Sequence, residues 1–301
     1  MKSHILITGD GGFVGRRALA YWSKATGLSS VAGGVDIRNK AALRECFAND
    51  LPDTVLHLAA LSFVPDSFKD PETTFEVNFL GTLRLFEVLA ECGFKGRLLY
   101  VSSGDAYGMV PTASLPIRET LPLRPRNPYA VSKAAAEALC FQWSQTGPFE
   151  VIVARPFNHI GPGQAPSFAI SDFARQIAEI AAGRRPAVLN VGNVDVTRDF
   201  TDVADVLRAY ELLLSRGHNG EIYNVCSGVE RSLRALLERL LELSDVRAEI
   251  VVDSVRFRPS DQPRVWGSYE KLSQHTGWHP EIPLDDTLLS IYRYWESEIG
   301  K

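Results

Sequence analysis

The chain has 301 residues, of which 45% are hydrophobic and 23% are charged, and its formal net charge is −4. These values are typical of a globular protein with one large or two closely packed domains, and the negative charge argues against a general nucleic-acid surface. No apolar stretch approaches the roughly twenty residues that span a bilayer, and the apolar run at residues 5–8 is too short for a signal peptide, so we expect a cytoplasmic protein without a membrane partner.

Apolar runs alternate with helical patterns along the first half of the chain. Residues 5–8 predict a buried strand, and the residues after it have helical spacing. Further strands are predicted at 54–59, 97–102 and 151–155, and helices at 13–24, 71–92 and 128–145. Such alternation predicts an α/β fold with a doubly wound parallel sheet over residues 1–155.

The pattern changes from residue 156 onward. Prolines and glycines cluster at 156–166, and shorter segments follow. These comprise helices at 172–182, 202–215 and 231–243 and strands at 222–225 and 248–252. We expect residues 156–301 to form a smaller α/β substrate-binding region, interleaved with the last strands of the sheet, with a cleft between the halves.

A glycine-spaced turn, TGDGGFVG at residues 8–15, connects the first predicted strand to the first helix. Gly9 allows a tight exit from the strand, Gly12 lets the backbone approach a pyrophosphate, and Gly15 lets the helix pack closely. The unpaired amides at the start of the helix then face the phosphates. The alternative is a turn that needs glycine only for its geometry, but its place between a strand and a helix favours nucleotide binding.

The preference between NADPH and NADH stays open. Asp36 lies 27 positions after Gly9, near the spacing of an acidic contact to the adenosine end of a dinucleotide, and we include Ile37 in that contact. Residues 33–35 (GGV) leave the end of the second strand bare. No residue there selects a ribose hydroxyl or a ribose phosphate.

Tyr129 and Lys133 are one helical turn apart, so their side chains share a face of the predicted helix. A phenol with a pKa of about 10 is a poor acid or base at neutral pH, and we expect the nearby ammonium of Lys133 to lower that pKa. Ser103 follows a predicted strand, where its hydroxyl would hydrogen-bond the reacting oxygen of a substrate. The alternative is a solvent-exposed Tyr-Lys pair and a serine that ends a strand.

Several phrases together resemble the extended short-chain dehydrogenase/reductases that act on nucleotide sugars. They are TGxxGFVG at 8–15, HLAA at 57–60, Asn78, SSGDAYG at 102–108 and PYxxSK at 128–133. The resemblance implies an NAD(P)H-dependent oxidoreductase with a Rossmann fold, in which Ser103, Tyr129 and Lys133 are catalytic. It also implies that the cofactor is contacted by the three glycines, Tyr129, Lys133, Phe13, Val14, Leu58, Ala59, Ala60, Asn78 and Phe157.

Further phrases resemble the members of this family that reduce the C4 ketone of GDP-4-dehydro-6-deoxy-D-mannose to GDP-D-rhamnose. They are RPFNHIGPGQ at 155–164, RDFTDV at 198–203, YNVCSG at 223–228, RPSD at 258–261 and TGWHP at 276–280. The implied contacts with the GDP-sugar come from Ser103, Gly104, Asp105, Asn158, Arg175, Arg198, Arg258 and Asp261. A guanidinium fork suits paired phosphate oxygens, so the arginines are expected at the diphosphate.

Other activities remain open. Related 4,6-dehydratases have a glutamate where this chain has Asp105, and the shorter side chain withdraws the carboxylate by on the order of 1.5 Å, which disfavours dehydration. A 4-epimerase with tightly bound NAD, or a reductase that forms GDP-6-deoxy-D-talose, would use the same trio. A dinucleotide-binding protein without catalysis is disfavoured, because a mere binder does not need Ser103, Tyr129 and Lys133.

We expect no metal site. His275 and His279 have the spacing of helical ligands, but Gly277 and Trp278 interrupt the helix between them. His57 lies in a buried strand and is interpreted as a core histidine. The four cysteines are far apart and have apolar neighbours, which indicates reduced thiols.

The family resemblance implies a homodimer that pairs helices 71–92 and 128–145 of both copies into a four-helix interface. Candidate apolar contacts are Phe79, Leu83, Phe86, Ala134, Ala138 and Phe141. A helix face that packs on a sheet has the same period, so the pattern permits either use.

Overall fold

The computed structural model describes residues 4–29, 34–48, 50–257 and 262–300. Its large sheet is parallel throughout and confirms the predicted doubly wound α/β fold. The strand order is β2 (Ala25–Gly27), β1 (Ile5–Thr8), β3 (Thr54–His57), β4 (Arg97–Val101), β5 (Glu150–Pro156) and β9 (Ile222–Val225). From β1 the chain forms β2 on one side and then returns to form β3 on the other side of β1. The carboxyl ends of β1 and β3 therefore flank the switch point where such sheets bind ligands.

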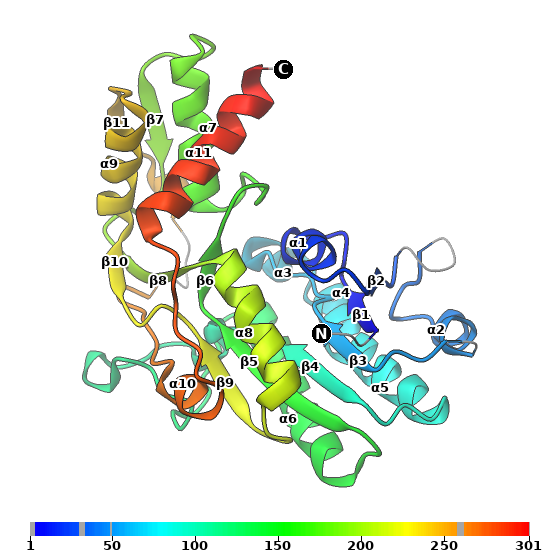
Figure 1. Cartoon of the computed structure of the whole chain (residues 1–301). Coiled ribbons are helices and arrows are strands. Elements are labelled where there is room, and N and C mark those ends of the chain that lie inside the picture. The colour runs from blue at the N-terminus through cyan, green and yellow to red at the C-terminus, as the bar shows by residue number, and fades with distance from the viewer. Residues whose placement is uncertain (1–3, 30–33, 49, 258–261, 301) are drawn as a thin grey trace.

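Helices cover both faces of this sheet (Figure 1). One face carries α1 (Phe13–Tyr21) and α8 (Val203–Arg216); the other carries α2 (Lys40–Phe47), α5 (Thr82–Glu91) and α6 (Pro128–Thr146). Successive strand residues alternate between the two cores: Ile5 and Ile7 face the α8 side and Leu6 faces the α5 side. Because both faces are covered, the strands are apolar without a polar alternation.

The predicted helix over 71–92 is divided into three parts. Helix α4 (Pro71–Phe75) leads into a π-helical turn, η1 (Glu76–Gly81), before α5 begins. At Gly81 a Cβ atom would lie 2.7 Å from Ile37 Cδ1, so the turn fits closely against the preceding loop. A further helix, α3 (Val64–Lys69), precedes α4 and was not predicted.

Helix α6 begins where the sequence predicts, because the Asn127 side chain accepts a hydrogen bond of 2.7 Å from the backbone N–H of Ala130. Pro128 occupies the first helical position, where its missing N–H carries no penalty. The carboxyl end of β4 therefore faces the first turns of α6, which carry Tyr129 and Lys133.

A second lobe has its own hydrophobic core. Helices α7 (Ala169–Ala181), α9 (Leu233–Ser244) and α11 (Leu284–Gly300) pack together with the parallel pair β7 (Val188–Val191) and β11 (Glu249–Val252), as Figure 1 shows. A small sheet of β10 (Glu230–Ser232), β8 (Thr197–Asp202) and β6 (Asn158–Ile160) joins this lobe to the large sheet. The remaining elements are α10 (Glu270–Thr276) and the 3₁₀ turns η2 (Gly104–Tyr107), η3 (Thr112–Ser114) and η4 (Ser254–Arg256).

The chain crosses between the lobes more than once. After β8 it returns to the large sheet as α8 and β9 before it enters β10 and α9. A division at residue 155 stays a prediction, since the later segment contributes one strand and one covering helix to the large sheet. Within the described ranges, no helix is both long and apolar enough to cross a membrane.

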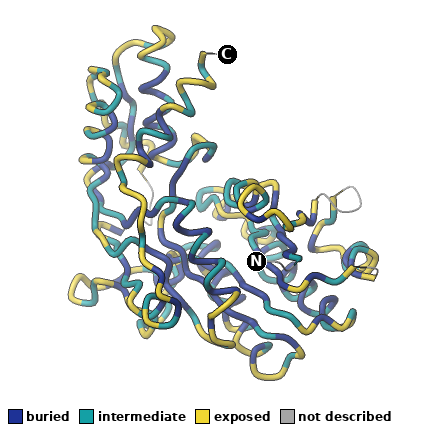
Figure 2. Tube along the Cα trace, viewed as in Figure 1, coloured by how far each residue is buried: buried dark blue, intermediate teal, exposed yellow. Residues whose placement is uncertain are grey.

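Burial follows the strands and the inner sides of their helices (Figure 2). Phe86 is fully buried and packs edge-on against Trp143 and Phe149, with 5.7 Å between ring centroids in each case. The prediction that Phe86 contributes to a subunit interface is therefore wrong, because this part of the α5 stripe faces the sheet. Phe141 on α6 does face outward, with 60% of its surface exposed.

Candidate active site

A cavity of about 1360 Å³ lies between the carboxyl edge of the large sheet and the second lobe. Its walls come from the glycine turn, the end of β4, the start of α6, β6 and α7. Sixteen of the residues predicted to bind or react line it: Gly9, Gly12, Phe13, Val14, Gly15, Leu58, Ala60, Ser103, Gly104, Asp105, Tyr129, Lys133, Phe157, Asn158, Arg175 and Arg198. Sequence positions that are far apart thus meet in one hollow.

The glycine turn has the geometry expected of a phosphate cradle. Gly9 has a φ of +70°, and a Cβ atom there would lie 2.7 Å from the backbone nitrogen of Ala59 on the neighbouring loop. A Cβ at Gly15 would collide with the backbone of Gly9 and Asp10. Helix α1 starts after Gly12 without a side-chain cap, so the amides of its first turn remain for an anion in the cavity. These groups fit the diphosphate of a dinucleotide.

Four predicted cofactor residues lie outside the cavity lining. The amide group of Asn78 bonds both backbone groups of Leu61, at 2.8 and 3.1 Å, and Ala59 N–H donates to Thr8 Oγ1 at 3.1 Å. Both residues therefore hold the loop that follows β3. Ile37 is buried beneath η1, and Asp36 forms an ion pair of 2.7 Å with Arg38.

Ser103, Tyr129 and Lys133 converge at the cavity wall. The Nζ of Lys133 donates to the carbonyl oxygen of Val101 at 2.7 Å and lies 4.8 Å from the centre of the Tyr100 ring. Burial lowers the pKa of Lys133 to about 8, against the opposing influence of Cys140 and Glu137. The lysine is thus held by the last residue of β4, two residues before Ser103.

Burial raises the pKa of the Tyr129 phenol above its ordinary value, and the charge of Asp105 adds to this effect. A hydrogen bond with the Ser103 side chain acts in the opposite direction. The expectation that Lys133 lowers the pKa of Tyr129 is not met, because burial and Asp105 raise that pKa and only Ser103 lowers it. Tyr129 is therefore held as a neutral phenol, which is the protonated state that a proton donor requires.

Asn158 and Arg198 also line the cavity. Asn158 is exposed at the start of β6, and Arg198 Nη1 donates to the carbonyl oxygens of Thr197 and Gln262, at 2.8 and 2.7 Å. Gly104 and Asp105 lie next to Ser103 in η2. The predicted ligands Arg258 and Asp261 lie outside the described residues.

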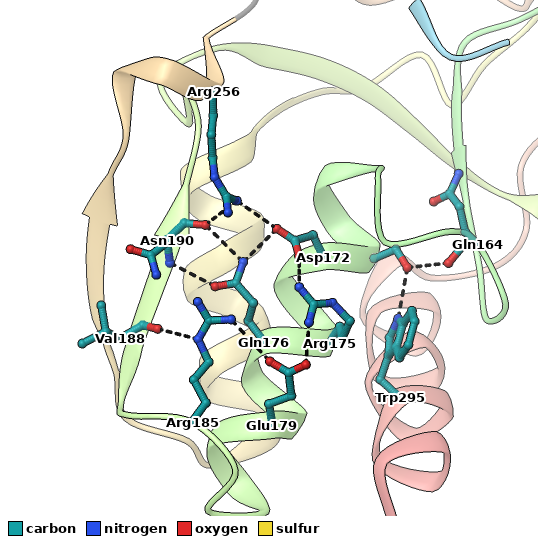
Figure 3. Close-up of polar contacts among 11 residues, drawn as sticks. Gln164, Asp172, Arg175, Gln176, Glu179, Arg185, Val188, Asn190, Arg256 and Trp295 are labelled. Atoms are coloured by element: carbon teal, nitrogen blue, oxygen red, sulfur yellow. Dashed lines mark hydrogen bonds and ion pairs between the residues drawn. The ribbon is translucent and has the colours of Figure 1, made fainter. Parts of the chain in front are cut away.

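Arg175 lines the cavity but is engaged by carboxylates of its own helix (Figure 3). Its guanidinium pairs with Asp172 at 2.7 Å and with Glu179 at 2.5 Å. Asp172 also pairs with Arg256, at 3.3 Å, and Arg256 donates to the carbonyl oxygen of Asn190 at 2.9 Å. A diphosphate at Arg175 would have to compete with these two carboxylates.

The cavity also contains residues to which the sequence assigned no role. Arg256 lines the cavity. In the sequence, only its position just before the phrase at 258–261 sets it apart from the other arginines. His159 stacks on Phe13 with 6.3 Å between centroids, and Gln164 donates to the carbonyl oxygen of His159 at 3.0 Å. Both lie in the phrase at 155–164, which was the signal available for them.

No three potential metal ligands come together anywhere in the described ranges. Helix α10 ends at Thr276, and Gly277 takes a left-handed conformation, so His275 and His279 do not share a helical face. Instead, His275 Nδ1 bonds the Tyr223 hydroxyl at 2.8 Å. The four cysteines are free thiols.

Comparison with known proteins gives consistent matches. The family model described as GDP-mannose 4,6 dehydratase matches residues 29–290. A GDP-6-deoxy-D-mannose reductase of Pseudomonas aeruginosa is 48% identical over 302 residues, which cover 99% of each chain. A solved structure of RMD from that organism, complexed with NADPH, superposes with a TM-score of 0.94 over 99% of this chain and 100% of the other, again at 48% identity. A GDP-6-deoxy-D-talose 4-dehydrogenase of Aggregatibacter actinomycetemcomitans is 29% identical over 279 residues, 89% of each chain.

Proposed function

The chain belongs to the GDP-mannose 4,6-dehydratase family of extended short-chain dehydrogenase/reductases, and from this premise we propose that it reduces the C4 ketone of GDP-4-dehydro-6-deoxy-D-mannose to GDP-D-rhamnose, with NADPH as reductant. The observation that carries the proposal is the 48% identity to a GDP-6-deoxy-D-mannose reductase along 99% of both chains. The geometry supports it, because Ser103, Tyr129 and Lys133 line one cavity beside the glycine turn.

The protein's own groups supply the proton and the charge stabilisation. Tyr129 donates its phenolic proton to the oxygen at C4, and its raised pKa keeps that proton in place at neutral pH. Ser103 hydrogen-bonds the same oxygen, and the Lys133 ammonium stabilises the negative charge that develops beside it. NADPH, when bound, supplies the hydride, which no side chain can provide.

The residues of the turn and the loop after β2 fit NADPH. The uncapped start of α1 offers backbone amides to phosphates, as described above. Arg38 binds both oxygens of Asp36, with Nε–Oδ1 at 3.1 Å and Nη2–Oδ2 at 2.7 Å. This ion pair neutralises a carboxylate that would otherwise repel the additional phosphate of NADPH, so we expect NADPH to be preferred over NADH.

Dehydration of a GDP-hexose is the second activity that the family name suggests. The family's dehydratases place a glutamate where this chain has Asp105, and a carboxylate withdrawn by about 1.5 Å is a displacement that costs on the order of a hundredfold in rate. We therefore expect GDP-mannose to be inert with the purified protein. Formation of a 4-keto product from it would return dehydration to consideration.

The test is a spectrophotometric assay at 340 nm, the absorbance of the reduced nicotinamide. Freshly generated GDP-4-dehydro-6-deoxy-D-mannose is added with NADPH or NADH, and NMR of the product distinguishes GDP-D-rhamnose from the talose epimer. We expect turnover with NADPH, and Tyr129→Phe to lower kcat by roughly 10²- to 10⁴-fold, the usual contribution of a general acid. If a folded wild-type protein oxidised neither cofactor, the reductase proposal would be contradicted and the epimerase would be tested next. A protein that carries bound NAD and interconverts epimers would be an epimerase.

The proposal extends to assembly and location. We place the protein in the cytoplasm, where its four free thiols remain reduced. We also propose a homodimer in which the outward sides of residues 71–92, which include η1 and α5, and of α6 pair with those of a second copy. The exposed Phe141 and Ala138, together with the half-buried Phe79, Leu83 and Ala134, support this arrangement.

A further inference from the structure

A buried ion pair lies directly behind the reacting side chains, and no step of the proposed reaction uses it. Glu137 on α6 and Arg155 on β5 each have only 4% of the side chain exposed. Arg155 Nε lies 2.9 and 3.1 Å from the two carboxylate oxygens, and its Nη2 lies 2.5 Å from Oε2. Both charges are therefore present and fixed in orientation.

Stability alone does not account for this pair. Removing two charges from water costs several kcal/mol per ion, and apolar residues of similar volume often replace such a pair without loss. Among the described residues, the Nη1 of Arg155 also has no hydrogen-bond partner. An apolar pair would hold β5 against α6 at least as well, so the charges indicate another role.

The contacts of Glu137 lead to the site. Its Oε1 accepts a short hydrogen bond from the hydroxyl of Ser102, the residue immediately before Ser103. On the other side of Ser102, the carbonyl oxygen of Val101 accepts the hydrogen bond from Lys133. Glu137 is also one helical turn beyond Lys133, so both side chains leave the same face of α6.

The contacts of Arg155 reach the other side of Ser103. Its guanidinium lies over the Tyr107 ring, 4.7 Å from the centroid, and Tyr107 is the last residue of η2. The Tyr107 hydroxyl in turn donates to Asn224 Oδ1 at 2.7 Å. The ion pair thus contacts the chain immediately before Ser103 and the short turn immediately after it.

The other groups that face Lys133 are neutral at physiological pH. On β3, burial lowers the pKa of His57 to about 3; on β4, burial raises the pKa of the Tyr100 phenol. On α6 itself, burial raises the pKa values of Tyr129 and the Cys140 thiol. Cys140 and Glu137 both oppose the desolvation of the Lys133 ammonium, and of these two Glu137 is the carboxylate.

We propose that Glu137, held by Arg155, is a positioning residue of the reductase: it fixes the end of β4 through Ser102 and keeps Lys133 protonated at neutral pH. The inference rests on the proposed function, since Lys133 is a reacting group only in a dehydrogenase site. It predicts that loss of the Glu137 charge weakens cofactor binding and turnover in a pH-dependent manner. A purely structural residue would weaken both equally at every pH.

The test compares Glu137→Gln with wild type from pH 5.5 to 9. Two quantities are measured: NADPH affinity, followed by fluorescence, and kcat/KM for the ketone. Both are expected to fall as the pH rises and Lys133 loses its proton, and this fall is the alkaline limb of each pH profile. In Glu137→Gln that limb should move down by about one pH unit, so that NADPH binding weakens on the order of fivefold at pH 8 and recovers near pH 6. Recovery at acid pH is the signature of an electrostatic role.

Asp205→Asn is the matched control. Asp205 is another buried carboxylate, which pairs with Arg208 at 2.7 Å and accepts the backbone N–H groups of Glu281 and Ile282 at 2.9 Å. The substitution removes the same charge from a buried helix position, so it should lower stability and leave the alkaline limb in place. The double variant Glu137→Gln/Arg155→Met leaves no unpaired ion. It replaces Glu137→Gln in the pH comparison if the single variant does not fold.

The outcomes separate the two proposals. An alkaline limb that moves to lower pH in the Glu137 variants but not in Asp205→Asn supports the inference. The NADPH-binding profile alone gives this result, so the inference can be tested even if the protein does not reduce the GDP-sugar. Failure of turnover with normal NADPH binding would contradict the proposed function alone. An alkaline limb of NADPH binding at the same pH in all variants would overturn the role of Glu137.

Discussion

At the scale of single residues, polar side chains buried in the large sheet hold the loops that carry the site. His57, at the end of β3, bonds Thr8 Oγ1 through Nδ1 at 2.6 Å and Thr82 Oγ1 through Nε2 at 2.9 Å. Thr8 is the first residue of the glycine turn, and Thr82 is the first residue of α5, so the histidine connects that turn to α5. The sequence indicated a core histidine here, and its two side-chain hydrogen bonds and near-complete burial confirm that interpretation.

His57 gives a prediction on the pH dependence of stability. Its pKa is about 3 in the folded protein and about 6.5 in an unfolded chain, so the folded form binds fewer protons between these values. Wild-type stability should therefore fall as the pH drops through this window, by up to about 1.4 kcal/mol per pH unit from this group. His57→Gln removes that contribution, so the variant should gain stability relative to wild type on acidification.

Urea unfolding at pH 7, 5.5 and 4.5 measures the difference. His279→Gln is the control, because the side chain of His279 is 61% exposed. We expect His279→Gln to keep the acid-dependent loss of stability, because His57 is retained in that variant. A constant difference for His57→Gln would show that His57 does not titrate with a lowered pKa.

At the scale of elements, the sequence predicted best those strands and helices whose local pattern reflects a structural requirement of the fold. Buried parallel strands are short and mostly apolar, and the glycine turn must join strand to helix, so β1, β3, β4, β5 and α6 are where the patterns place them. Helix α3 is only six residues long and too short to show a period. The π-helical turn depends on Gly81 lying against Ile37, a tertiary contact that no local pattern contains.

The same distinction holds for side chains. Phe86 lies on an apolar stripe whose period is equally suited to a sheet or to a second subunit, and only the fold decides that it faces Trp143 and Phe149. Arg175 was expected at a diphosphate from resemblance, but Asp172, three residues before it, and Glu179, four residues after it, bind it within α7. Motifs thus predicted that Ser103, Tyr129 and Lys133 lie together, as they do at the cavity wall, whereas ion pairs among common surface residues required the structure.

The turn between β1 and α1 gives a prediction for an element. In Gly15→Ala the new Cβ would lie 2.5 Å from Asp10 Cα, so α1 must shift away from the turn. Overpacking of this kind costs about 1–3 kcal/mol of stability. The shift also removes the amides of α1 from the phosphates, and a misplacement of about 1 Å is of the size that costs on the order of a hundredfold.

Gly11→Ala is the matched control from the same turn. A Cβ there has no heavy atom within 4 Å and Gly11 does not line the cavity, so stability and NADPH binding should both be retained. Thermal unfolding and NADPH titration by fluorescence measure the two quantities. Equal losses in both variants would mean that the turn tolerates no side chain anywhere, and that close packing at Gly15 has no special role.

At the scale of the whole molecule, one helix serves both the site and the outer surface. The inner side of α6 carries Tyr129, Lys133 and Glu137, all buried. Its outer side presents Val131, which is 39% exposed, and Phe141, which is 60% exposed, with Ala134 and Ala138 between them. Spacings of three and four residues align these four side chains in one stripe. An apolar stripe on the helix that positions the reacting groups is the surface expected to bind a second copy.

Phe141→Asp tests the homodimer. A charge at the most exposed position of the stripe would have to be buried without a partner, so the variant should be a monomer by light scattering at micromolar concentrations at which wild type is a dimer. Phe141→Leu keeps the apolar contact and should remain dimeric. Because Phe141 points away from the cavity, monomeric Phe141→Asp should keep its NADPH affinity within about threefold, as expected for a surface change distant from the site. A monomeric wild type would contradict the homodimer, and a dimer that withstands Phe141→Asp would place the subunit contact on another face. In either case the exposed stripe of α6 would need a different explanation.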